Sequence, residues 1–328
     1  MISSLLVRLY SPAGDLRTGA ERATAAGLGA LFLDGIPTGA LSGSERQALL
    51  RAAARTASDH ALQVRELATV LDVLAAAGVR PALLKGLHLA QAWPRPELRP
   101  IGDLDLLIDA ARLERAAGAL ERVGYRRGPD DPGGRWRPEP TGVELIAPPG
   151  RAFGVDLHAR LFRSVGHGVD AGAVLARARP IRIGSAEVLA LEPADELLFV
   201  YVHAAKHGVR QPKWLLDLHA LAKRADRATW NEAMRHAVET GTARAFGAAA
   251  RLVARLPGAA VPAGASPPAL LAPIFDRLFT VDKALQRTPL GTAERYALEL
   301  LLEPSVYGRA RMAAGVVERL VTAAAGRR

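Results

Sequence analysis

Three aspartates in this sequence have the side-chain type and the spacing that a metal site requires. Asp103 and Asp105 stand at alternate positions of the apolar run GDLDLLID, residues 102–109. Because side chains alternate across a strand, we expect both carboxylates on one face, where they repel each other unless a cation lies between them. Oxygen ligands of this kind suit Mg²⁺, with Mn²⁺ as an alternative. Asp156, in the apolar run 151–158, is the best candidate for a third carboxylate, because that run could pair alongside as another strand.

A glycine turn upstream of the aspartates is suited to binding phosphate. Lys85 and Gly86 follow the apolar run 79–84 and precede a segment of helical character, 87–93. Glycine lets the backbone approach phosphate oxygens at a helix N-terminus, and Lys85 adds a positive charge there. An isolated Asp-x-Asp pair is also typical of a solvated strand face, so Lys85, Gly86 and Asp156 are what favour a metal site.

At four segments the sequence resembles the nucleotidyltransferase superfamily whose fold is typified by DNA polymerase beta. Within it, the sequence is similar to bacterial nucleotidyltransferase family proteins with a Lys-Gly motif. The segments that carry the resemblance are LLKGLHLA (83–90), LRPIGDLDLLID (98–109), VDLH (155–158) and HAAKHGVRQPKWLLDLHAL (203–221). The resemblance covers roughly residues 60–230.

This resemblance implies roles for individual residues. Metal-binding and catalytic roles fall on Asp103, Asp105 and Asp156. Nucleotide-binding roles fall on Lys85, Gly86, Arg99, His203, His207, Lys213 and Asp217. Leu87 departs from the wider pattern, which has a second glycine or a serine at that position.

Two other interpretations of His203 and His207 stay open. Their spacing of four fits two zinc ligands on one helix face. They are equally well explained as histidines packed against Trp214.

The family resemblance implies an enzyme that moves a nucleoside monophosphate from a nucleoside triphosphate to an acceptor hydroxyl with Mg²⁺. A small molecule or natural product is the favoured acceptor, and a protein hydroxyl is the second choice. One alternative is a catalytically weak nucleotide- or nucleic-acid-binding module of the same fold. Another is a scaffold whose C-terminal helices bind a partner protein.

The elements that position these residues are expected in three parts. Residues 1–75 form a helical N-terminal region that ends in a long amphipathic helix from Glu45. Residues 76–190 form an α/β core and residues 191–328 a helical C-terminal domain. The predicted fold class is therefore α+β, a small mixed-sheet nucleotidyltransferase core with helical regions on both sides.

Within the core, residues 79–84 are predicted to be a strand at an edge of the sheet, because Pro81 cannot donate to a ladder. Residues 142–147 and 151–158 are predicted to form a hairpin around the turn 148–150. Residues 128–140 are rich in glycine and proline and are predicted to be a flexible loop. The C-terminal patterns predict helices over 194–207, 212–224, 228–240, 243–255, 266–284, 291–303 and 308–325.

Composition narrows the partners. The chain of 328 residues has 43 Lys and Arg against 33 Asp and Glu, a net charge of +10. The arginines are scattered through the sequence instead of forming blocks, so nucleic acid is a less favoured partner than a nucleotide. No cysteine is present, which excludes disulfides and thiolate metal sites and fits a reducing compartment. With neither a signal peptide nor a long apolar run, the sequence predicts a cytoplasmic protein with no membrane partner.

Overall fold

The computed structural model describes residues 2–128, 142–162, 169–265, 270–306, 308–310 and 314. A mixed sheet of seven strands and many helices confirm the predicted α+β class. The strands are β1 (Ala82–Leu83), β2 (Leu104–Leu107), β3 (Arg126–Arg127), β4 (Gly142–Ile146), β5 (Val155–His158), β6 (Arg179–Ile183) and β7 (Ala186–Ala190). Their order in the sheet is β3-β4-β5-β2-β1-β7-β6.

The centre of the sheet is formed by β1, β2 and β5. β2 pairs with β5 in parallel and with β1 in antiparallel orientation, while β1 also pairs with β7 in parallel. The prediction that the first strand lies at an edge is therefore wrong. Pro81 precedes β1 and so does not interrupt its ladder, which leaves β1 free to pair on both sides. The predicted hairpin is confirmed, since β4 and β5 pair in antiparallel orientation.

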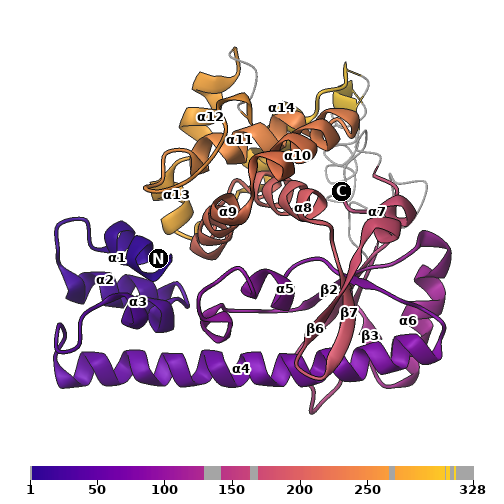
Figure 1. Ribbon diagram of the computed structural model, residues 1–328, viewed down its shortest axis with the longest axis horizontal. Coiled ribbons are helices and arrows are strands. Elements are labelled where there is room, and N and C mark those ends of the chain that lie inside the picture. Colours follow the sequence, from indigo (N-terminus) through magenta and orange to yellow (C-terminus); the bar gives the residue numbers. More distant parts are fainter. Residues whose placement is uncertain are drawn as a thin grey trace, which may run out of the picture.

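The helix α4 (Gly43–Ala76) underlies most of the molecule and confirms the long helix predicted from Glu45 (Figure 1). It begins at a capping box, in which the Ser42 backbone and hydroxyl both donate to the Glu45 carboxylate, at 3.0 and 2.6 Å. Its first half packs against the N-terminal helices and its second half against the sheet region (Figure 1). The N-terminal helices are α1 (Ile2–Tyr10), α2 (Leu16–Ala25) and α3 (Gly29–Gly35).

The two faces of the sheet bury different partners. Leu104 and Leu106 of β2 join a core with Leu67 of α4 and with α6 (Leu113–Arg122), whereas Leu107 joins the larger core of the C-terminal helices. Because side chains alternate along β2, Asp105 lies on the same face as Leu107. Asp105 is thus turned away from α4. The short elements around the sheet are α5 (Leu87–Ala90), η1 (Pro96–Leu98), η2 (Ala110–Arg112) and α7 (Ala171–Arg177).

The C-terminal helices lie above the sheet (Figure 1). They are α8 (Pro193–Lys206), α9 (Pro212–Arg224), α10 (Arg227–Glu239), α11 (Ala243–Val253), η4 (Ala263–Ala265), α12 (Ala272–Leu278), α13 (Val281–Leu285) and α14 (Thr292–Leu302). The single helix predicted over 266–284 is instead two short helices, α12 and α13. The predicted helix over 308–325 and the predicted loop over 128–140 fall almost entirely outside the described residues.

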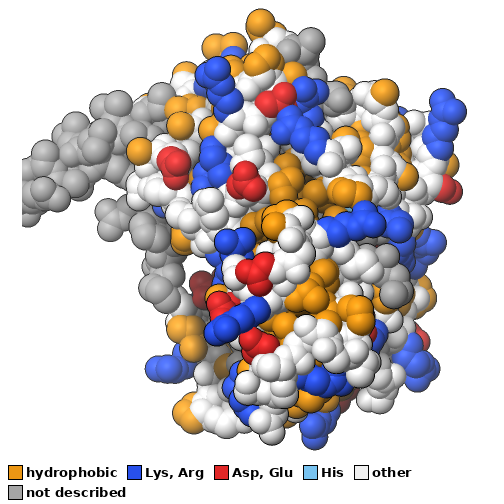
Figure 2. Space-filling view, turned by 90° about the vertical axis from the view of Figure 1, so that its left-hand side faces the viewer, with side chains coloured by type: hydrophobic (Ala, Val, Ile, Leu, Met, Phe, Trp, Pro, Cys, Tyr) orange, Lys and Arg blue, Asp and Glu red, His pale blue; other side chains and the backbone are white. Residues whose placement is uncertain are grey.

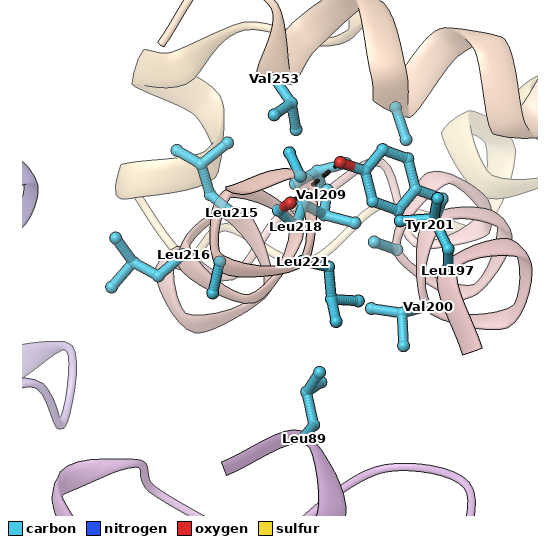
Figure 3. Packing of buried hydrophobic residues seen from close by; sticks show 14 of the residues in the cluster. Leu89, Leu197, Val200, Tyr201, Val209, Leu215, Leu216, Leu218, Leu221 and Val253 are labelled. Carbon is cyan, nitrogen blue, oxygen red and sulfur yellow. Dashed lines mark hydrogen bonds between the residues drawn. The ribbon is translucent and has the colours of Figure 1, made fainter. Parts of the chain in front are cut away.

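The pairing of α8 with α9 is fixed by a buried contact between them. Tyr201 on α8 donates its hydroxyl to the Leu218 carbonyl on α9 at 2.9 Å, within a cluster of leucine and valine side chains (Figure 3). Tyr201 also packs edge-on against Trp230 and close to Phe246. These contacts hold α8 and α9 in one orientation above the carboxyl-bearing face of the sheet.

Two further observations concern the membrane and the charge on the protein surface. Among the helices that the structure describes, none has the length and apolarity needed to cross a lipid bilayer. On the face that includes the N-terminal helices, Lys and Arg side chains are scattered among acidic and apolar ones (Figure 2).

Candidate active site

The sheet brings two of the predicted aspartates side by side. Asp105 on β2 is the direct neighbour of Asp156 on β5, so both carboxylates lie on one face. Asp103 lies just outside β2, which begins at Leu104, so its predicted place within the strand is wrong. Its carboxylate nevertheless reaches the same group of side chains, through Lys85.

Asp105 is the buried centre of this group, with only 1% of its surface exposed. The Lys85 ammonium lies 2.8 Å from its Oδ1 and 4.0 Å from Oδ2 of Asp103. Burial alone would raise the pKa of Asp105, but the charge of Lys85 and the hydrogen bond from His158 outweigh it, so that this pKa lies well below its usual range. Asp105 is therefore an anion in this structure. The pKa of Asp103 is raised, first by burial and then by repulsion from Asp105.

His158 is a site residue that sequence analysis did not assign to the site, because its sequence context left open whether it orients Asp156 or contacts substrate. Its Nε2 lies 3.3 Å from Oδ1 of Asp105 and 3.1 Å from Oδ2 of Asp156. Burial lowers the pKa of His158, but its bonds to the two aspartates outweigh burial and raise it. The signal in the sequence was its spacing of two from Asp156, which places both side chains on the same face of β5.

The donors present fit a divalent metal ion. Asp105, Asp156 and His158 each offer one ligand atom, and these atoms lie within 4.8 Å of one another. Oδ2 of Asp105 is buried and has no hydrogen-bond partner among the described residues. A buried carboxylate oxygen without a partner is costly, and a metal ion would supply that partner. Asp103 is not part of this compact group, so its role as a metal ligand stays a prediction.

The glycine turn begins α5 directly beside the aspartates. Gly86 has φ +69° and ψ −114°, a conformation that L side chains rarely adopt. The turn is held by Arg99, whose Nη1 donates to the Gly86 carbonyl at 3.2 Å. Leu87 is fully buried in the core between the sheet and α4. The side chain at this position therefore stabilises the core beneath the turn, which explains why it is apolar.

Arg99 and Asp217 are engaged with each other. Nε and Nη2 of Arg99 donate to the two oxygens of Asp217, both at 2.8 Å, and Trp93 donates its Nε1 to the same carboxylate at 2.9 Å. Asp217 has no exposed surface and Arg99 only 3%. Because the two side chains are buried against each other, their nucleotide-binding role stays a prediction. Arg99 contacts both the Gly86 carbonyl and Asp217, so this pair joins α9 to the Gly86 turn.

His203 of α8 and His207, the residue that caps its C-terminus, pack against Trp214 of α9, which is one of the two alternatives left open by the sequence. The His203 ring lies 5.6 Å and the His207 ring 5.3 Å from the Trp214 ring, centroid to centroid. Within the described residues no third ligand joins them, so the zinc interpretation has no support there. Burial, followed by the charge of Lys85, lowers the pKa of both, and that of His207 to about 4. By surface area, the residue His207 is nevertheless exposed.

Positive charges from the helices face the carboxylates of the sheet. Burial lowers the pKa of Lys213 on α9. The positive charge of Lys85 lowers this pKa further, and the negative charge of Asp103 raises it. Lys206 on α8 and Arg295 on α14 contribute to the lowered pKa of His207. Among the described residues, Lys213 has no carboxylate within ion-pair distance, which leaves its charge available for an anion.

Gln63 of α4 is a second residue that sequence analysis missed. It is completely buried, and its Nε2 donates to the backbone carbonyl of Asp103 at 3.1 Å. The contact fixes the backbone just before β2. Because α4 reads as an ordinary amphipathic helix, no sequence signal marks Gln63 beyond a polar residue on its apolar face.

Comparison with known proteins assigns the family. No curated protein matches the chain in sequence. The model of a family described as an uncharacterised nucleotidyltransferase matches residues 15–258, more than half of the chain and all of the site described above. The chain therefore belongs to this uncharacterised nucleotidyltransferase family.

Proposed function

We propose that the protein transfers a nucleoside monophosphate from a nucleoside triphosphate to the hydroxyl of a small molecule or natural product. An oxygen of the acceptor forms a bond to the α-phosphorus, the bond to the β-phosphate oxygen breaks, and pyrophosphate leaves. The observation that carries the proposal is the group of carboxylates on β2 and β5 together with Lys213 on α9, which interacts electrostatically with Asp103 and has no carboxylate within ion-pair distance among the described residues. Acidic metal ligands on one side and cations on the other suit a metal-bound polyphosphate between them.

Asp105, Asp156 and His158 would hold the metal ion, with Asp103 at the edge of the site. When bound, a divalent ion neutralises charge on the phosphates and polarises the phosphorus–oxygen bond. Mg²⁺ fits the carboxylates, and the imidazole nitrogen in the donor set makes Mn²⁺ a suitable alternative. His158 also orients Asp156 through its 3.1 Å contact, whatever ion is bound.

Lys85 and Lys213 are the proposed phosphate-binding side chains. Lys85 extends from the Gly86 turn and Lys213 from the first turn of α9, so the two ammonium groups approach from different elements. His203, His207 and Trp214 then form an aromatic surface beside these cations, on which a nucleobase can stack. Arg99 and Asp217 keep α9 in register with the Gly86 turn.

Asp156 is the proposed acceptor of the proton from the attacking hydroxyl. Its side chain is 22% exposed, whereas that of Asp105 is 1% exposed, so only Asp156 of this strand pair can be reached by an acceptor. A positioned carboxylate of this kind contributes roughly 10²–10⁴-fold to a rate. The remaining catalytic effect is positioning and charge neutralisation.

The test is transfer of label from α-³²P-labelled triphosphates to a panel of hydroxylated small molecules, with Mg²⁺ or Mn²⁺. We expect the parent to release pyrophosphate with matched label transfer, and Asp103→Asn and Asp156→Asn to lose most of it. Asp59→Asn, an exposed position on α4, is the matched control and should react like the parent. Binding of triphosphate without transfer to any acceptor would favour the non-catalytic module, and equal rates for the parent and the Asn variants would overturn the proposal.

A further inference from the structure

Lys85 occupies the gap between Asp103 and Asp105. Its ammonium is 2.8 Å from Oδ1 of the buried Asp105 and 4.0 Å from Oδ2 of Asp103. Burying a carboxylate without a cation is strongly unfavourable, and Lys85 is the closest cation among the described residues. In the protein alone, then, Lys85 balances a charge that lies at the centre of the metal site.

The backbone holds Lys85 in this place. The Leu84 amide donates to the Asp105 carbonyl at 3.0 Å, continuing the antiparallel ladder of β1 and β2. Lys85 follows immediately and precedes the constrained turn at Gly86. Lys85 can therefore leave Asp105 only by rotating its side chain, which as a whole is one-fifth exposed.

A divalent ion and the ammonium would share one carboxylate, because Lys85 binds Oδ1 of Asp105 while Oδ2 of the same carboxylate has no hydrogen-bond partner among the described residues. An ion bound to Asp105 would lie about 2.1 Å from a carboxylate oxygen, and two positive charges at such close range repel each other. Resting on the proposed function, we propose that Lys85 is a built-in counter-ion that keeps the Asp105 carboxylate closed to a free metal ion until a metal–triphosphate complex arrives. The substrate of the site is then the complex, and free metal binds weakly.

The triphosphate provides the partner that releases Lys85. Phosphate oxygens can accept the Lys85 ammonium, so its departure from Asp105 costs less when the nucleotide is present. Metal and triphosphate consequently favour each other's binding, and linkage requires this coupling to be equal in both directions. Lys85 carries the part of the coupling that belongs to the protein.

Titration with Mn²⁺ alone, followed by calorimetry and by the electron paramagnetic resonance of free Mn²⁺, tests the inference. Removing a cation at this distance shifts an ionic equilibrium by about one to three powers of ten, so Lys85→Met should bind Mn²⁺ about tenfold or more tightly than the parent. Lys85→Arg should show no such gain. Lys223→Met, which removes an equal charge from an exposed position in the last turn of α9, should change Mn²⁺ affinity by less than about threefold.

A second measurement repeats the Mn²⁺ titration of the parent and of Lys85→Met with a triphosphate analogue present. A non-hydrolysable triphosphate analogue should strengthen Mn²⁺ binding to the parent more than to Lys85→Met, and this comparison removes the contribution from the metal–phosphate contact itself. Equal or weaker Mn²⁺ binding by Lys85→Met would overturn the inference, as would parent Mn²⁺ affinity that is the same with and without the analogue. Neither titration requires transfer, so a failed transfer assay refutes the proposed function and leaves this test intact.

Discussion

Replacing Asp217 by asparagine should destabilise the fold strongly and change nucleotide affinity little. The substitution keeps the size of the side chain but removes the charge and one of the two acceptors that Arg99 uses, both now at 2.8 Å. Arg99 has only 3% of its surface exposed, so water cannot replace the lost partner. Breaking one side of a buried ion pair costs about 3–5 kcal/mol, and the retained Trp93 bond places this variant near the lower end.

Urea denaturation, followed by tryptophan fluorescence and far-ultraviolet circular dichroism, measures this loss. In a parallel thermal melt, a cost of about 3 kcal/mol corresponds to a fall in melting temperature of about 4 °C for a chain of 328 residues. The double variant Arg99→Met with Asp217→Leu removes both charges and should recover most of the lost free energy of unfolding. Asp276→Asn is the matched control, because Asp276 binds Arg251 at 2.6 and 2.8 Å but is about one-third exposed, and it should cost less than about 1 kcal/mol.

Nucleotide affinity distinguishes the two roles of Asp217. If Asp217 only joins α9 to the Gly86 turn, folded Asp217→Asn should bind the triphosphate within about threefold of the parent, or roughly 0.7 kcal/mol. Unchanged stability together with a large loss of affinity would refute the reasoning. That result would identify Asp217 as a residue in direct contact with the nucleotide.

Two further predictions concern the supports of the site. Gln63→Leu removes the donor to the Asp103 carbonyl, so the transfer rate in steady-state kinetics should fall by about tenfold. The free energy of unfolding, measured by urea denaturation, should fall by roughly 1–3 kcal/mol. An unchanged rate would show that the contact does not position Asp103. The pKa of His207 is lowered from 6.5 to about 4, so the unfolded chain binds a proton that the folded protein excludes, and stability should rise with pH between these values. The slope of melting temperature against pH over this window should decrease in His207→Gln, and an identical slope would mean that the ring titrates normally in the folded protein.

Local patterns in the sequence were sufficient for the elements that carry the site. The capping box at Ser42 and Glu45 places the start of α4, and the prolines at 193 and 212 place the first turns of α8 and α9. Such features act within one turn of a helix, so neighbouring residues determine them. The alternation of Asp105 with apolar residues likewise indicated its strand, although β2 begins one residue later than predicted.

The contacts that give each site residue its role were decided only by the tertiary structure. Asp217 lies 118 residues from Arg99, and Gln63 lies 40 residues from Asp103. Which charge is buried, and which partner neutralises it, depends on how distant segments pack, and no local pattern records that. For the same reason the carboxylates were predicted from their spacing, whereas the contacts of His158 with two aspartates, the ion pair of Lys85 with Asp105 and the inward direction of Leu87 emerged only when β1, β2 and β5 came together in the sheet.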